Sequence, residues 1–125
     1  SFQTVEHLSN PIEFLYKLSK TNCRGLVVTL PYKKQSRVAL THIRQNSKEQ
    51  TCAEKTHIFE LSPSDWRLIF QHSGWEIRHE TTYLQYPKKH WLRGMRYFWK
   101  KYDFEGFYGV ILKRNPNWSS LYLDW

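Results

Sequence analysis

The stretch THIFELSPSDWRLIFQHSGWEIRHETT, residues 56–82, contains the clearest local structure signals of this 125-residue chain. Ser62 followed by Pro63 is a typical helix start, because the serine side chain can cap free amides and proline fits the first helical position. Apolar side chains then recur at helical spacing, and Gly74 supplies the left-handed residue that ends many helices. From residue 75 to residue 83 every second residue (Trp75, Ile77, His79, Thr81 and Tyr83) alternates with mostly charged ones. The stretch therefore predicts a helix followed by a strand with one solvated face.

Working outward toward the N-terminus, residues 10–22 predict a second helix. Asn10 can cap it, Pro11 fits its first position, and Glu13 can complete a capping box. Residues 26–30, LVVTL, form an apolar run without alternation, which is typical of a parallel strand covered on both faces. We expect Pro31 to end this strand.

Toward the C-terminus, residues 91–102 predict a third, amphipathic helix and residues 107–113 a last strand. Residues 32–55 show little periodicity, so they form either a long loop with a functional role or a segment with a short helix near residues 38–44. The order helix–strand–helix–strand–helix–strand predicts one α/β domain over residues 1–125. Because a helical crossover joins the first two strands, we expect them to run parallel.

Three segments together carry a family resemblance: VEHL at residues 5–8, GLVVTLP at residues 25–31, and the helix–strand stretch that begins at His57. In this order they resemble the second half of a class I S-adenosylmethionine (SAM)-dependent methyltransferase, and the resemblance covers residues 1–114. It implies that the last strand inserts, antiparallel, between the first two. The expected fold is a small mixed three-stranded sheet with flanking helices, the C-terminal half of a Rossmann-like methyltransferase fold.

The resemblance also implies a cofactor, SAM, and a division of its site. Ser1, Phe2 and Gln3 take the positions that line the methionine end of SAM. The family's glycine-rich loop and its ribose-binding acidic residue are not in these 125 residues. We therefore expect a methyltransferase when complete, and no SAM binding by this chain alone. The strand at residues 26–30 would lie at a sheet edge, where an unpaired apolar strand favours self-association.

His7 and His57 are the candidate catalytic residues, since imidazole titrates near neutral pH and can act as a general base. Some relatives bind a divalent metal through E-x-x-E-H and a later histidine. Here the pattern reads Gln3-x-x-Glu6-His7, and the amide of Gln3 replaces a carboxylate that a hard cation prefers. We therefore expect a substrate-side or structural role for this cluster and no metal.

The net charge of +8 is unevenly distributed. Eleven of the 19 lysines and arginines lie in residues 33–48 and 88–101, which contain no acidic residue. Such clusters attract anionic partners, although a solvated helix face or a basic loop would have the same composition. The candidate substrate-binding residues are Glu6, Tyr32, Arg37, His42, Arg93 and Arg96.

Two functions remain open. The first is the C-terminal portion of a SAM-dependent methyltransferase, whose acceptor is anionic if both basic segments line its cleft. The alternative is a non-catalytic methyltransferase-like module whose basic surface binds nucleic acid or another anionic polymer. The chain has no G-x-S-x-G motif and no P-loop. No apolar run approaches the ~20 residues of a membrane span. Cys23 and Cys52 lack metal or redox spacing, which favours free thiols in a reducing cytoplasm over a disulfide.

Overall fold

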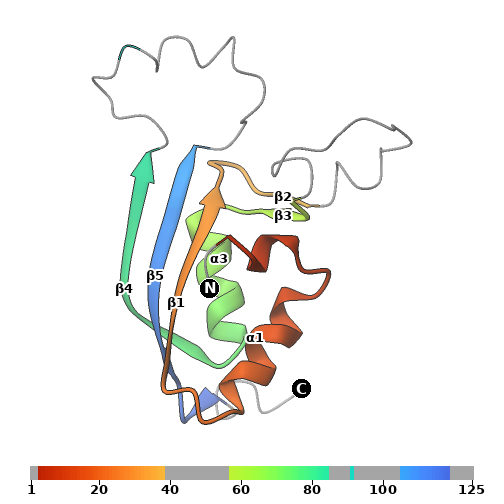
Figure 1. Ribbon diagram of the computed structural model, residues 1–125, viewed down its shortest axis with the longest axis vertical. Coiled ribbons are helices and arrows are strands. Elements are labelled where there is room, and N and C mark those ends of the chain that lie inside the picture. The colour runs from red at the N-terminus through yellow and green to blue at the C-terminus, as the bar shows by residue number, and fades with distance from the viewer. Residues whose placement is uncertain (1–2, 39–56, 85–90, 92–104, 119–125) are drawn as a thin grey trace.

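The computed structural model describes residues 3–38, 57–84, 91 and 105–118. These residues form one three-stranded sheet, one two-stranded pair and a set of helices (Figure 1). In chain order the elements are η1 (Val5–His7), α1 (Pro11–Ser19), β1 (Gly25–Tyr32), β2 (Arg37–Val38), β3 (Phe59–Glu60), α3 (Pro63–His72), β4 (Trp75–Leu84) and β5 (Gly106–Arg114). The third predicted helix, residues 91–102, lies outside the described residues except for Trp91.

The larger sheet has the strand order β1–β5–β4. The last strand lies between the two earlier ones and pairs antiparallel with both, which confirms the predicted insertion. Because β1 and β4 share this antiparallel neighbour, they point the same way (Figure 1). They do not pair with each other, so both hydrogen-bonded pairs of this sheet are antiparallel and its pairing is not mixed.

Both α-helices begin with the capping chemistry expected from the sequence. In α1 the Asn10 side chain accepts a hydrogen bond from the Glu13 amide at 3.0 Å, and Pro11 occupies the first turn. In α3 the Ser62 hydroxyl accepts from the Asp65 amide at 3.3 Å. Each cap satisfies an amide that the helix itself cannot pair.

Gly74 ends α3 as predicted, with a left-handed φ of 86°. A side chain here would also collide, because an added Cβ would lie 2.9 Å from the hydroxyl oxygen of Ser19 at the end of α1. The Gly74 carbonyl accepts a hydrogen bond from the Asn115 amide at 2.9 Å. This glycine therefore allows α3, α1 and the turn after β5 to approach one another closely.

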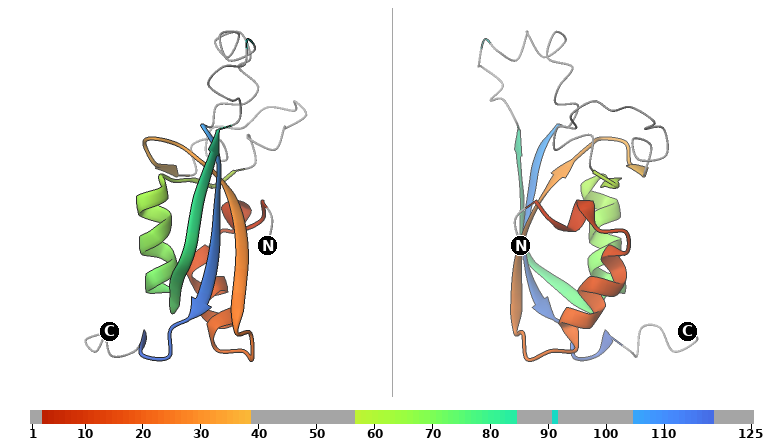
Figure 2. Two further views of the ribbon diagram at one scale, coloured as in Figure 1. Left: turned by 90° about the vertical axis from the view of Figure 1, so that its left-hand side faces the viewer. Right: turned by 45° about the vertical axis from the view of Figure 1, so that its right-hand side comes forward.

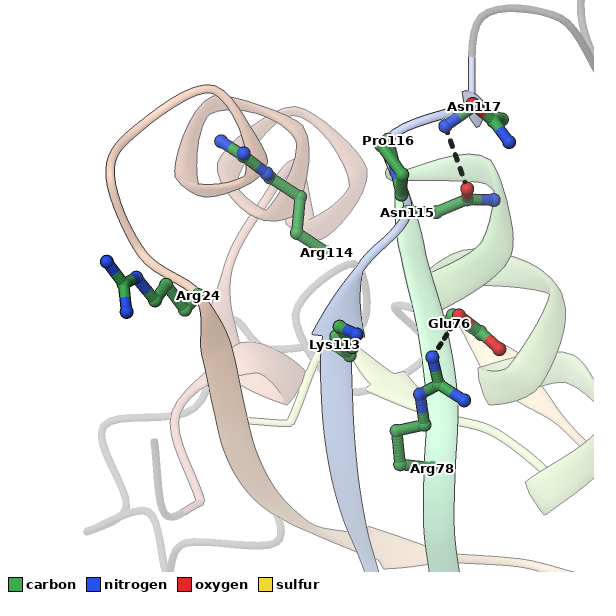
Figure 3. Close-up of a pocket in the computed structure, with 8 residues that line it drawn as sticks. All are labelled: Arg24, Glu76, Arg78, Lys113, Arg114, Asn115, Pro116 and Asn117. Atoms are coloured by element: carbon green, nitrogen blue, oxygen red, sulfur yellow. Dashed lines mark hydrogen bonds and ion pairs between the residues drawn. The ribbon is translucent and has the colours of Figure 1, made fainter.

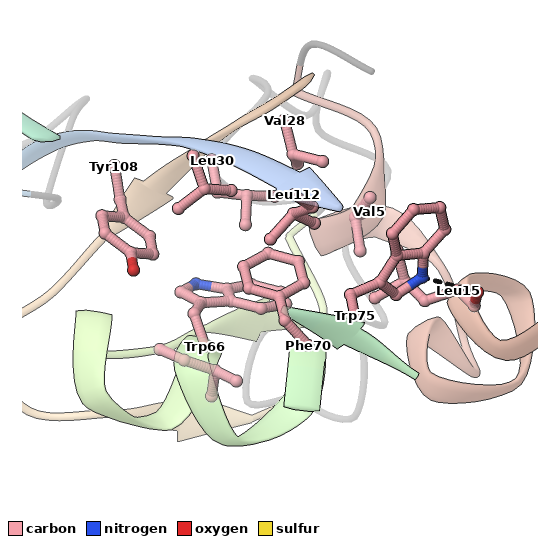
Figure 4. Packing of buried hydrophobic residues seen from close by; sticks show 11 residues of the cluster. Val5, Leu15, Val28, Leu30, Trp66, Phe70, Trp75, Tyr108 and Leu112 are labelled. Carbon is pink, nitrogen blue, oxygen red and sulfur yellow. Dashed lines mark hydrogen bonds between the residues drawn. The ribbon is translucent and has the colours of Figure 1, made fainter. Parts of the chain in front are cut away.

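The core lies between the helices and one face of the sheet. Trp66 and Phe70 of α3 face the buried residues of β1 and β5 (Figure 4). Trp75 packs at the other end, where its indole nitrogen donates to the Leu15 carbonyl at 2.9 Å. Figure 2 shows α1 and α3 on the same side of the sheet. Among the described residues, eleven buried apolar side chains form this cluster.

The prediction that the first strand is covered on both faces is wrong. Val28 and Leu30 are fully buried, whereas Val27, which precedes Val28 and faces the other side of the sheet, is 49% exposed. On the neighbouring strand Ile111 is 46% exposed on that same face, opposite Val27 in register. An apolar run without alternation therefore does not show burial on both faces, because β-branched residues also suit a half-exposed strand.

The edge of β1 also differs from expectation. The strand continues through Pro31 to Tyr32, so proline does not end it. The Gln3 amide donates to the Thr29 carbonyl at 2.9 Å on the side of β1 away from β5. Pro31 is two residues after Thr29, so its backbone nitrogen is on the same side of the strand, away from β5. The N–H group that proline lacks would therefore not have paired with β5, and no hydrogen bond of the sheet is lost. The N-terminal segment thus partly covers the edge expected to be bare.

A β-bulge interrupts β4 between Ile77 and His79. Ile77 pairs with the buried Leu112, but His79 pairs with the exposed Ile111. The extra residue shifts the alternation by one, so the second half of β4 presents the opposite set of side chains to the helices. Glu80 thereby faces α3.

Within the described part of the chain, no helix has the length and apolar character that spanning a membrane requires.

Candidate functional site

The candidate site lies where η1, the C-terminal half of β1 and β3 meet. The Ile58 amide donates to the Glu6 carbonyl at 2.9 Å and fixes η1 against the segment that leads into β3. The Lys33 amide donates to the Leu61 carbonyl at 3.2 Å and ties the end of β1 to the segment between β3 and α3. β1 and β4 both end at this end of the sheet (Figure 1). Ligands of open α/β sheets bind beyond the carboxyl ends of strands, so the location suits a site.

The two candidate histidines come together although fifty residues separate them in sequence. The rings of His7 and His57 contact edge to face, with their centres 4.8 Å apart. The His57 side chain is only 6% exposed, whereas that of His7 is 31% exposed. His7 is therefore the imidazole that an external molecule can reach, and His57 supports it from inside.

Glu60 orients the inner histidine. Its carboxylate contacts the Nδ1 atom of His57 at 2.9 Å and also accepts a hydrogen bond from the Arg37 guanidinium. Burial alone would raise the pKa of Glu60, but the hydrogen bonds from His57 and Arg37 outweigh burial and lower this pKa. An ionised Glu60 accepts a hydrogen bond from the Nδ1–H group of His57, and in the neutral imidazole this tautomer leaves Nε2 as the acceptor nitrogen.

Glu6 is the opposite case within the same cluster. Its side chain is fully buried, and neither carboxylate oxygen has a hydrogen-bond partner among the described residues. The Nε2 atom of His7 lies 3.9 Å from its Oε1, beyond hydrogen-bonding distance. Burial raises the pKa of Glu6 to about 7, against smaller lowering effects from its own backbone amide and from His57. Near neutral pH this carboxyl group is about half protonated, which is the property of a proton donor or acceptor rather than of a structural ion.

Glu6, His7 and His57 are also the described residues that could hold a metal ion, with one ligand atom from each within 4.8 Å of the others. Glu60 orients His57 as carboxylates commonly orient metal-bound histidines. Ligands of a zinc ion lie about 2.0–2.2 Å from it, so no two of them are more than about 4.4 Å apart. A pair of these ligand atoms that is 4.8 Å apart would have to move closer together before both could bind one zinc ion.

The remaining predicted residues are not all placed in this cluster. Arg37 contributes, but its charge is directed at Glu60 and is not free for a substrate. Tyr32 is half-buried against the core, and its carbonyl accepts from the Glu105 amide at 2.9 Å. Gln3 lies beside β1 with an exposed side chain and a left-handed φ of 49°, an uncommon conformation for a residue other than glycine. Ser1, Phe2, His42, Arg93 and Arg96 lie outside the described residues.

Sequence reasoning missed Glu60, the residue that organises the cluster. The signal was present in the quoted stretch, since His57 and Glu60 are three residues apart just before the capped helix. A second carboxylate network was not predicted from the sequence either. Arg67 of α3 makes a two-pronged contact with Glu80 of β4, with N···O distances of 2.8 and 2.6 Å, and the Tyr108 hydroxyl also donates to Glu80. Only the bulge in β4, which alternation did not reveal, places Glu80 there.

Comparison with known proteins gives no identity for these features. No protein-family model matches the chain, and no curated protein matches its sequence. The geometry of the described residues and the sequence motifs are therefore the basis for a function.

Proposed function

We propose that this chain is the C-terminal portion of a SAM-dependent methyltransferase, in which His7 and His57 take up a proton from the methyl acceptor. The buried cluster of Glu6, His7 and His57 beside the C-terminal half of β1 is the observation that carries the proposal. Paired carboxyl and imidazole groups with opposed environments are typical of sites that move protons.

The arrangement of the strands supports the proposal from a second direction. The family resemblance implies a last strand inserted antiparallel between the first two, and β5 occupies that position between β1 and β4. Gln3, one of the three residues carried over for the methionine end of SAM, exposes its side chain beside β1 near the histidine cluster. The described residues thus fit the acceptor side of such a site, and the glycine loop for the remainder is not in this sequence.

When bound, SAM supplies an electrophilic methyl group on a sulfonium sulfur. The groups of this chain act on the acceptor. His7, the more exposed imidazole, accepts a hydrogen bond from the attacking hydroxyl or amine group. His57, oriented by the ionised Glu60, stabilises positive charge that develops on this pair as the acceptor loses its proton. Glu6, half protonated near pH 7, provides the nearby carboxyl group that takes up or releases a proton between turnovers.

Calorimetric titration of SAM tests the assignment. We expect no binding to the 125-residue chain and binding to the gene product that contains it, because the cofactor loop implied by the resemblance is not among these residues. In that longer protein, His7→Gln should lower transfer of labelled methyl groups to hydroxyl-, amine- and carboxylate-bearing acceptors by about 100-fold, as removal of a general base commonly does. SAM affinity should not change. A longer protein that binds no SAM would overturn the proposal.

A further inference from the structure

A second feature lies at the opposite end of the sheet from the histidine cluster. It is a surface hollow of about 540 Å³, formed where β1 and β4 begin and β5 ends (Figure 3). Four cations and one carboxylate line it: Arg24, Arg78, Lys113, Arg114 and Glu76. The five side chains therefore give the hollow a charge of about +3 at neutral pH.

Two of the four cations, Arg24 and Lys113, form no ion pair with the described residues. Glu76 contacts Arg78 at 3.1 Å, and Arg114 donates to the Thr21 carbonyl at 3.3 Å. Exposed cations without partners repel one another, so a bound anion relieves that repulsion as well as adding attraction.

The positions of the cations favour an extended anion. Lys113 lies between Arg24 and Arg78 in Figure 3, and the three residues belong to or border β5, β1 and β4. Neighbouring strands are about 4.8 Å apart, so the row spans about 10 Å, more than one phosphate group occupies. Guanidinium groups bind phosphate oxygens with two parallel hydrogen bonds, which a row of two arginines and a lysine can offer along a polymer.

The wall of the hollow is preorganised and lacks stacking groups. The turn after β5 is held by the Asn115 side chain, which accepts from the Asn117 amide at 3.0 Å. No aromatic side chain lines the hollow among the described residues. Contacts to phosphate oxygens need only positive charge and hydrogen-bond donors, and they carry no sequence information, which is read from the edges of the bases.

We infer that this hollow binds the phosphate backbone of a nucleic acid strand, without sequence preference. The inference concerns residues at the far end of the sheet and does not depend on the methyltransferase proposal. Fluorescence anisotropy of a short labelled single-stranded DNA of mixed sequence, titrated with the 125-residue chain, tests it.

Glu76→Gln is the first variant. It removes the carboxylate that competes with a phosphate group for Arg78, so the affinity for the DNA strand at low salt should rise about threefold. Glu13→Gln is its control, since Glu13 is also an exposed glutamate paired with a neighbouring cation but lies on α1, away from the hollow. A gain of affinity cannot come from misfolding. Equal affinities of the two variants would overturn the inference.

The double variant Arg24→Gln, Lys113→Gln is the second. Affinity should fall about tenfold at low salt, and the slope of log K against log salt should fall by about 1.4, because each lost phosphate contact contributes about 0.7. The control Lys17→Gln, Lys34→Gln changes the net charge equally and should retain the slope. A lost slope in both double variants, or no binding by the unaltered chain, would overturn the inference. Displacement by inorganic tripolyphosphate at equal phosphate concentration would assign the hollow to a small polyphosphate instead of a strand.

Discussion

Two buried carboxyl groups flank His57, and their pKa values are shifted in opposite directions. Glu60 of β3 is 2% exposed and Glu6 of η1 is fully buried, so water is almost equally excluded from both. The pKa of Glu60 is nevertheless lowered, while that of Glu6 is raised to about 7. The difference is in their partners, since Glu60 has His57 and Arg37 and neither oxygen of Glu6 has a hydrogen-bond partner among the described residues.

Burial thus sets the size of the penalty for a charge, and hydrogen-bonding partners decide whether the charge persists. On the β3 side the result is a fixed ion that orients an imidazole. On the η1 side it is a carboxyl group that gains or loses its proton near neutral pH. A site that moves protons needs both kinds of group, which is why the contrast matters for the proposed function.

The largest expected effect comes from removing the partnered carboxylate. Glu60→Leu keeps most of the side-chain volume but leaves the Arg37 guanidinium and Nδ1 of His57 without their acceptor. Breaking a buried ionic contact on one side commonly costs about 3–5 kcal/mol of unfolding free energy. Urea denaturation followed by tryptophan fluorescence measures this loss.

Glu13→Gln is the control for that variant, because Glu13 also contacts a cation, Lys17 at 2.7 Å, but at an exposed position on α1. Its denaturation midpoint should not move measurably, since solvent screens exposed ion pairs. If Glu60→Leu moved the midpoint no more than Glu13→Gln does, the contrast between partnered and unpartnered carboxylates would lose its basis.

The next effect concerns pH. Glu6 has a folded pKa of about 7 against 4.5 when unperturbed. Between these values the folded chain binds a proton that the unfolded chain has released, so this group stabilises the fold fully below pH 4.5 and its contribution is lost as pH rises through 7. The difference corresponds to about 3 kcal/mol of unfolding free energy.

Glu6→Gln should remove this dependence. The unfolding free energy of the variant relative to the unaltered chain should rise by about 3 kcal/mol between pH 4.5 and pH 8. Urea denaturation over that pH range measures it. Glu13→Gln again serves as control, because Lys17 lowers the pKa of Glu13 and any change runs in the opposite direction. A pH profile of Glu6→Gln parallel to that of the unaltered chain would contradict the raised pKa.

Sequence reasoning found the parts of this fold that local chemistry determines. The caps at Asn10 and Ser62 and the stop at Gly74 depend on neighbouring residues only, and all three were predicted correctly. It also placed β5 between β1 and β4, through the family resemblance. The covering of β1 was wrong because burial of Val27 depends on what packs on the far face of the sheet, and no local pattern records that.

For the candidate site, too, only some of the features were predicted from the sequence. His7, His57 and Glu6 were selected from motifs, and the fold brings them together. The protonation of Glu6 could not be predicted, since it depends on which atoms fail to reach its carboxylate. Glu60 was overlooked because a glutamate near a helix start is usually a solvated residue.

The smallest expected effect tests a partnered carboxylate near the surface. Glu80 lies on β4 beyond the bulge, and its pKa is lowered mainly by the hydrogen bond from Arg67, then by that from Tyr108. The Arg67 side chain is 46% exposed and that of Glu80 34%, so solvent screens this pair despite its two-pronged geometry. Arg67→Met keeps the aliphatic contact with α3 and β4 and removes the charge. It should lower the unfolding free energy by less than about 1 kcal/mol, because Tyr108 still donates to Glu80 and water replaces the guanidinium. The same urea measurement compares it with Glu60→Leu. A loss as large as that of Glu60→Leu would mean that exposure does not govern the strength of these contacts, and that the buried cluster around His57 has no electrostatic distinction from the surface.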